Sequence, residues 1–119
     1  MRRIVLTLAA AVATAAIVLV PAYGTTTMLS GEVGPGFSIE VKKGGKDLEK
    51  IKAGTYKIKV EDKASIHNFH LFGPGLNKKT GVSFKGETTW TIKLKAGRYT
   101  YQCDPHHLSG MRGHFTVTK

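Results

Sequence analysis

After residue 24 the chain alternates apolar and polar residues along short segments separated by glycine- and proline-rich turns, and this pattern constrains the fold most strongly. Successive side chains of a β-strand point to opposite faces, so a period of two predicts strands with one buried face. The inward positions of the clearest segments are Phe37, Ile39 and Val41, then Tyr56, Ile58 and Val60, then Trp90, Ile92 and Leu94, then Tyr99, Tyr101 and Cys103, and finally Phe115 and Val117. No segment of this region sustains the 3.6-residue period of an amphipathic helix, so an all-β fold is expected.

The segments add up to about eight short strands. We expect a first strand at Met28–Val33, another at residues 67–71 and the last at residues 114–118. Residues 72–87 form a 16-residue connection with room for a short strand at residues 82–84. Short strands with turn signals between them are typical of an antiparallel β-sandwich.

Two stretches of the chain have similar sequences. Lys52 to Tyr56 and Lys95 to Tyr99 share the pattern Lys-Ala-Gly-x-Tyr, and each precedes an alternating strand. We therefore expect two equivalent corners of the sandwich at these places.

The first 24 residues have the composition of an export signal. Arg2 and Arg3 give a basic start, residues 4–20 are almost entirely apolar or small, and small residues suited to cleavage follow. The apolar run is at the short limit of about 17 residues for a membrane-spanning helix. We expect a cleaved signal in residues 1–24, with an uncleaved N-terminal anchor as the alternative, and a periplasmic or extracellular location.

Residues 25–119 then form a single domain, which we expect to be a monomer. Lys and Arg outnumber Asp and Glu by 18 to 8 in the whole chain, and only two of these cations, Arg2 and Arg3, lie in the signal. Such a surface suits a soluble protein and can steer association toward an acidic partner or an anionic membrane. The lysines are spread along the strands and no nucleic-acid motif is present, so nucleic acid is not an expected partner.

Residues 103–111 place three metal-binding side chains in one short loop. These are Cys103, the only cysteine of the chain, then His106 and Met111. A single cysteine cannot form an internal disulfide, so in an exported protein its thiol needs another explanation. Thiolate, imidazole and thioether together suit copper, and a trigonal set of two His and one Cys with a weak axial Met is found in copper sites that transfer electrons. One further histidine is therefore expected from elsewhere in the chain.

His67 is the candidate for that fourth ligand. It has the parity of Phe69 in its strand, and Cys103 has the parity of Tyr101, so both side chains are expected to point into the interior. Met111 has the parity of the inward residues of the last strand. Ligand candidates on separate strands are thus expected to point into the same interior. This expectation agrees with the spacing of Cys103, His106 and Met111 in the loop.

The remaining histidines are expected to lie outside the site. His70 and His114 have outward parity and are interpreted as ordinary surface residues. His107 adjoins a ligand candidate and should be exposed, with a role in tuning or docking as the alternative.

Simpler interpretations exist for each residue of the motif. A lone Cys at a strand end is usually a small buried apolar residue. Zinc does not take a thioether ligand, and a catalytic Cys–His pair needs a third group to orient the histidine. The ordered combination of Cys, His and Met with an inward upstream His favours copper over all three.

Over nearly the whole of residues 25–119 the chain resembles the cupredoxins. The loop at residues 103–113 is similar in length and glycine placement to the ligand loop of plastocyanin, and residues 67–71 resemble the amicyanin segment in which the first His binds copper. The resemblance implies a Greek-key β-sandwich with Asn68 bracing the two ligand-bearing segments. It also implies one copper ion at one end, held by His67, Cys103, His106 and Met111. The match departs at Asp104 and His107.

Two functions follow as hypotheses. The first is an electron carrier that cycles between Cu(I) and Cu(II), with His106 as the exit and Pro105 and Leu108 as docking neighbours. Its partner would be a redox protein, such as a cytochrome or oxidase with an acidic docking face. The alternative is a copper-binding or copper-delivery protein that uses His70, His107 or His114 as entry ligands. An enzyme is not expected, because a multicopper oxidase needs further His ligands and a second domain.

Overall fold

The computed structural model describes residue 11 and residues 26–119 of the chain. The expected signal or anchor in residues 1–24 therefore lies outside the described residues, apart from residue 11. Within the part that is described, no helix is long and apolar enough to cross a membrane.

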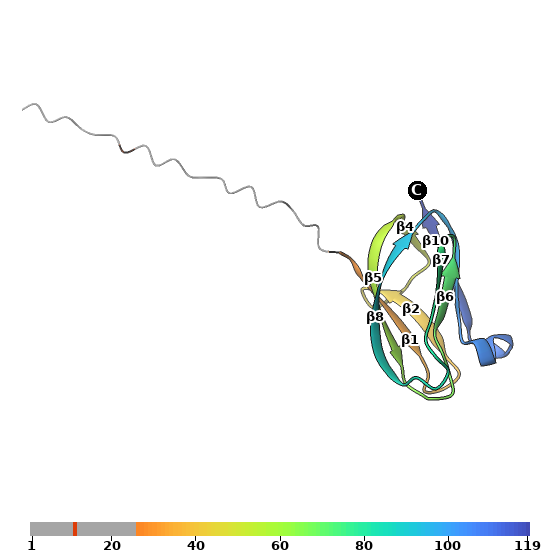
Figure 1. Cartoon of the computed structure of the whole chain (residues 1–119). Helices are drawn as coiled ribbons and strands as arrows, with labels where there is room; N and C mark the ends of the chain where they lie inside the picture. Colours follow the sequence, from red (N-terminus) through yellow and green to blue (C-terminus); the bar gives the residue numbers. More distant parts are fainter. Residues whose placement is uncertain (1–10, 12–25) are drawn as a thin grey trace, which may run out of the picture.

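In the described part of the chain, ten strands form two sheets. Figure 1 shows that the two sheets face each other. The first sheet has the order β3-β2-β1-β5-β8, with β1 at Met28–Val33, β2 at Ile39–Lys43, β3 at Lys46–Asp47, β5 at Gly54–Asp62 and β8 at Gly86–Leu94. The second sheet has the order β4-β10-β9-β6-β7, with β4 at Lys50–Lys52, β6 at His70–Gly73, β7 at Leu76–Lys79, β9 at Gly97–Gln102 and β10 at Arg112–Thr118. One 3₁₀ helix, η1, spans Asp104–Ser109. The predicted all-β sandwich is confirmed.

Both sheets contain one parallel pairing. Strand β1 runs parallel to β5, and β4 runs parallel to β10, whereas the other pairs are antiparallel. The sheets are therefore mixed where a wholly antiparallel sandwich was expected. Residue parity constrains which face a strand buries but leaves the direction of its neighbour open, which is why the sequence did not reveal these pairs.

The core lies between the two sheets and follows the predicted alternation. Ile58 and Val60 of β5, for example, are fully buried, while the lysines between and beside them are exposed. Tyr99 of β9 stacks on Phe115 of β10 with ring centroids 5.4 Å apart. Burial of each such apolar side chain contributes about 1.5–3 kcal/mol, so the alternation itself stabilises the sandwich.

The two Lys-Ala-Gly-x-Tyr stretches form equivalent corners, as predicted. The Tyr56 hydroxyl donates a hydrogen bond to the Lys52 carbonyl at 2.6 Å, and the Tyr99 hydroxyl donates to the Lys95 carbonyl at 3.1 Å. Each tyrosine thus closes the turn four residues behind it. Tyr99 is fully buried, whereas Tyr56 is only partly buried.

Some strand boundaries differ from the prediction. Phe37 precedes β2 and is 65% exposed, so the inward alternation begins at Ile39. Residues 82–84 form a turn, and the additional strand of that connection is β7 instead. Strand β6 begins at His70, so His67 lies in the loop that leads into it.

Candidate metal centre

The candidate ligands meet at the end of the sandwich opposite to the C-terminus (Figure 1). His67 lies in the loop between β5 and β6, and Cys103 follows directly after the last residue of β9. His106 lies in η1, and Met111 comes immediately before β10. The loop before β6 and the segment that joins β9 to β10 therefore converge, because β6 and β9 are neighbours in the second sheet.

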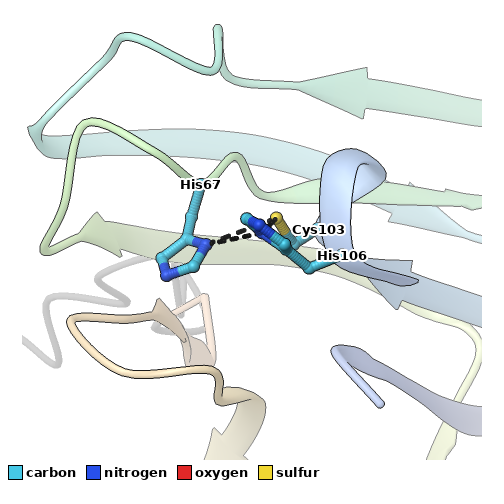
Figure 2. A group of neighbouring side chains, drawn as sticks. All are labelled: His67, Cys103 and His106. Carbon is cyan, nitrogen blue, oxygen red and sulfur yellow. Dashed lines mark hydrogen bonds between the residues drawn. The ribbon is translucent and has the colours of Figure 1, made fainter. Parts of the chain in front are cut away.

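Three donor atoms form a small triangle, as Figure 2 shows. Nδ1 of His67 lies 3.1 Å from Nδ1 of His106, and Sγ of Cys103 lies 3.6 Å from the first nitrogen and 3.4 Å from the second. A point in the plane of such a triangle is about 2 Å from each corner, while zinc, the first-row neighbour of copper, binds imidazole at about 2.0 Å and thiolate at about 2.3 Å. The triangle thus fits a single metal ion.

The donor set identifies the metal that fits. Two imidazoles and one thiolate in a trigonal arrangement suit copper, and His67 and Cys103 are fully buried while His106 is only half-buried. The geometry therefore fits one copper ion that is enclosed by the protein except along the His106 side.

Met111 is fully buried and belongs to the same apolar cluster as Cys103. Its backbone carbonyl accepts a hydrogen bond from the Cys103 amide at 3.0 Å, and its own amide donates to the His106 carbonyl at 3.3 Å. The loop is therefore closed on itself around the triangle. The contact between the Met111 thioether and a metal stays a prediction.

The loop conformation follows from two residues. Pro105 stands in the first turn of η1, where the missing N–H costs nothing and the fixed φ angle suits a helix start. Gly110 ends η1 with φ of 95°, a left-handed conformation that glycine adopts without strain, and its amide bonds the His106 carbonyl. These two residues aim His106 back toward Cys103.

Asn68 ties the two ligand-bearing segments together, as the resemblance implied. Its Oδ1 accepts a hydrogen bond from the Asp104 amide at 2.7 Å, and its Nδ2 donates to Oδ2 of Asp104 at 2.9 Å. The next amide in the chain, that of Phe69, donates to the Thr80 hydroxyl at 2.8 Å. The neighbours of both His67 and Cys103 are therefore fixed.

The Asp104 carboxylate is the centre of a wider network that the sequence did not reveal. Gln102 and His70 each approach Oδ1, at 2.9 Å and 2.8 Å, while Asn68 donates to Oδ2. Burial alone raises the pKa of Asp104, but the hydrogen bonds from Gln102, His70 and Asn68 outweigh it and lower the pKa to about 2. A carboxylate therefore remains charged next to the thiolate ligand candidate.

The other histidines only partly follow the prediction. His70 is not an ordinary surface residue: its side chain is 17% exposed, and its second nitrogen lies 2.6 Å from Oδ1 of Asn77. The side chain does have the outward parity that the sequence predicts, but the neighbouring strands and Asp104 cover the face of the sheet to which it points. His107 is half-buried and donates to the Asp104 carbonyl at 2.7 Å, so full exposure was also a wrong expectation. His114 is exposed, as predicted.

Phe37 was not recognised as part of the site. Its ring meets His106 edge-to-face with centroids 4.9 Å apart, and His67 at 5.5 Å. It covers both imidazoles from the solvent side although it is itself largely exposed. Its position directly after the Gly34-Pro35-Gly36 turn was the only sequence signal, and the alternation with Ile39 and Val41 instead predicted a buried strand residue.

Known families and solved structures include several that are similar to this chain. The family model for copper binding proteins of the plastocyanin/azurin family matches residues 22–118. Reduced rusticyanin is 29% identical with a TM-score of 0.60, over 80% of this chain and 81% of the other. Rusticyanin from Thiobacillus ferrooxidans is 25% identical with a TM-score of 0.56, over 80% and 79%. An amicyanin variant is 19% identical with a TM-score of 0.49, over 75% and 80%. No curated protein sequence matches the chain.

Proposed function

Because this chain belongs to the plastocyanin/azurin family of copper-binding proteins, we propose that it is an exported one-electron carrier that holds a single copper ion. A bound copper ion supplies the Cu(I)/Cu(II) couple. The proposed ligands are His67, Cys103, His106 and Met111. The proposal includes no enzymatic activity.

The observation that carries the proposal is the triangle of Nδ1, Nδ1 and Sγ already assembled by the fold. Each donor is held by a different constraint: His67 by the loop before β6, Cys103 by the end of β9, and His106 by η1. Ligands held in this way keep one geometry in both oxidation states. A small rearrangement on each transfer is what a carrier needs.

His106 is the proposed exit for the electron. It is the only one of the four ligand candidates that reaches solvent within the described residues. Exposed apolar side chains on this end include Phe37 at 65%, Ile66 at 53% and Leu108 at 90%. An apolar surface with one redox-linked imidazole suits brief docking to a partner, since apolar contact needs little desolvation of charge.

The proposed partner is a redox protein with an acidic docking face, such as a cytochrome or an oxidase. The excess of positive charge supports this choice, because Lys and Arg outnumber Asp and Glu by 18 to 8, only Arg2 and Arg3 lie in the signal-like residues, and a positive surface attracts an acidic one. The signal-like residues 1–24 support a periplasmic or extracellular location for the encounter.

The test is the visible spectrum of the protein loaded with Cu(II). Thiolate bonded to Cu(II) gives an intense charge-transfer band, so Cys103→Ser should remove the colour. His67→Ala and His106→Ala should weaken or reshape the band, and Met111→Leu should keep the colour but change the reduction potential, because the axial ligand tunes that potential.

His114→Ala is the matched control, because His114 is exposed and bonds only Thr100 among the described residues. Its spectrum should equal that of the unmodified protein. A colourless unmodified protein, or a coloured Cys103→Ser variant, would refute the proposed site.

A further inference from the structure

Two buried polar atoms lack a hydrogen-bond partner among the described side chains. One is Nε2 of His67 and the other is Oδ2 of Asp62, the last residue of β5. Both residues are almost completely inaccessible to solvent, with exposed fractions of 0% and 1%. Buried polar groups normally find a partner, so each of these atoms needs an explanation.

Gly34 lies between His67 and the amide that bonds Asp62. A Cβ atom on Gly34 would lie 3.0 Å from Cδ2 of His67, which is bonded to Nε2, and 3.7 Å from the amide nitrogen of Ala64. That same amide donates to Oδ1 of Asp62 at 3.2 Å. Burial raises the pKa of the Asp62 carboxyl, while the Ala64 hydrogen bond and the charge that His67 can carry oppose this rise.

The orientation of His67 decides which group donates. Its Nδ1 points into the triangle with His106 and Cys103. A neutral imidazole that offers Nδ1 as a metal ligand must carry its proton on Nε2. His67 therefore presents a buried N–H without an acceptor, and Asp62 presents a buried carboxylate oxygen without a donor. Each group can therefore serve as the hydrogen-bond partner that the other lacks.

We propose that Asp62 is a positioning residue that accepts a hydrogen bond from Nε2–H of His67, directly or through one water, and so keeps Nδ1 free for the metal. The inference rests on the proposed copper site. A carboxylate behind a histidine ligand fixes the tautomer and the ring orientation and makes the imidazole a better donor. Glycine at position 34 is consistent with this arrangement, because a side chain there would meet the His67 ring, and φ of 76° also favours glycine at this position.

The first experiment uses the metal-free protein, so its result does not depend on copper. Nuclear magnetic resonance of the His67 ring should show the Nε2–H tautomer, with slow exchange of that proton. In Asp62→Asn the side-chain amide oxygen can accept a hydrogen bond from either the Ala64 amide or the His67 ring but not from both. The Nε2 proton of His67 should therefore exchange at least tenfold faster. A His67 that carries its proton on Nδ1 in the unmodified protein would overturn the inference, as would an Asp62→Asn variant with unchanged exchange.

The second experiment uses the copper-loaded protein. Loss of a carboxylate behind a ligand histidine typically weakens metal binding by about 10–100-fold, so Asp62→Asn should release copper faster and have a higher reduction potential. Glu61→Gln is the matched control, since it removes the same charge from the adjacent residue of β5, whose side chain points to the opposite face. Equal changes in both variants would refute a specific link to His67.

The two experiments separate the inference from the proposed function. If Asp62→Asn does not fold, the tautomer of the unmodified protein still decides the inference. If the unmodified protein gives no coloured copper site, the proposed function fails, and the dependence of the His67 tautomer on Asp62 is still decided by the first experiment.

Discussion

Asp104 shows what a single residue contributes at the candidate centre. Its carboxylate accepts hydrogen bonds from three side chains, and its pKa is lowered to about 2. An unfolded aspartate has a pKa of about 3.9, so the unfolded chain takes up the proton first as the pH falls. The stabilisation is therefore fully present above about pH 4 and is lost as the pH falls toward 2.

We predict that the metal-free Asp104→Asn variant loses less stability than the unmodified protein between pH 4 and pH 2. At neutral pH the variant should be less stable by on the order of 1 kcal/mol, a value reduced by solvent screening because the side chain is 36% exposed. Urea unfolding at several pH values measures both effects. Asp47→Asn, at an exposed acid of β3, is the control and should keep the steeper profile. Identical profiles for all three proteins would contradict the assignment.

The residues of the centre differ in how far a sequence can reveal them. Cys103, His106 and Met111 are predicted from their spacing within one short loop. His67 was predicted from its inward parity, and its side chain is buried as expected, although it lies in the loop before β6 and not in a strand. The partners of Asp104 come from β6, from the loop before it and from β9, and their contacts depend on how β6 and β9 lie side by side. Phe37 escaped notice for a similar reason, since its place over the histidines is set by the path of a turn.

At the scale of elements, the corner closed by Tyr99 is expected to contribute more than the one closed by Tyr56. The Tyr99 hydroxyl donates toward the Pro74 carbonyl at 2.9 Å and the Lys95 carbonyl at 3.1 Å, and it accepts from the Lys95 amide at 3.0 Å. Tyr56 makes one such bond, to the Lys52 carbonyl.

Tyr99→Phe should therefore lower the free energy of unfolding by about 1–3 kcal/mol, because backbone groups lose their partner in a buried place. Tyr56→Phe should cost about 0.5–1 kcal/mol at most, since water can replace the lost bond. Thermal or urea unfolding of the two variants gives the comparison. A larger loss for Tyr56→Phe would show that the two corners have the opposite ranking.

Strand content was easier to predict than strand pairing. Alternating segments such as β5 and β8 bury one face each, so their burial patterns repeat the period of the sequence. Strand β7 was missed because Leu76-Asn77-Lys78-Lys79 offers a single apolar residue, and its place beside β6 comes from a tight turn. The helix η1 is too short to show a period at all, and only Pro105 and Gly110 mark its ends.

For the molecule as a whole, the excess of positive charge should govern how fast a partner is found. Among the described residues, three lysines form surface ion pairs with glutamates, namely Lys42, Lys59 and Lys63. In the whole chain Lys and Arg outnumber Asp and Glu by 18 to 8. We predict that electron exchange with an acidic partner slows as salt is added, because the attraction is screened over about 8 Å at physiological ionic strength. Stopped-flow kinetics at increasing salt measures this. A rate that is constant or rises would indicate docking through the apolar end alone.

The last prediction separates an electron carrier from a copper-delivery protein. A delivery protein must open its site, whereas here His67, Cys103 and Met111 are fully buried among packed strands. The histidines considered as entry ligands are engaged elsewhere: His70 with Asp104 and Asn77, His107 with the Asp104 carbonyl, and His114 with Thr100.

The packed strands that keep the site closed also hold the ligands in place. We therefore predict reversible voltammetry together with slow loss of copper to a chelator. Gly110→Pro offers a matched perturbation: φ of 95° is closed to proline, so the loop must rearrange while both sheets remain. This variant should lose copper faster and show wider separation of the voltammetric peaks, with a smaller effect on unfolding of the sandwich. Rapid, partner-driven copper transfer by the unmodified protein, combined with sluggish electron exchange, would instead favour the delivery role.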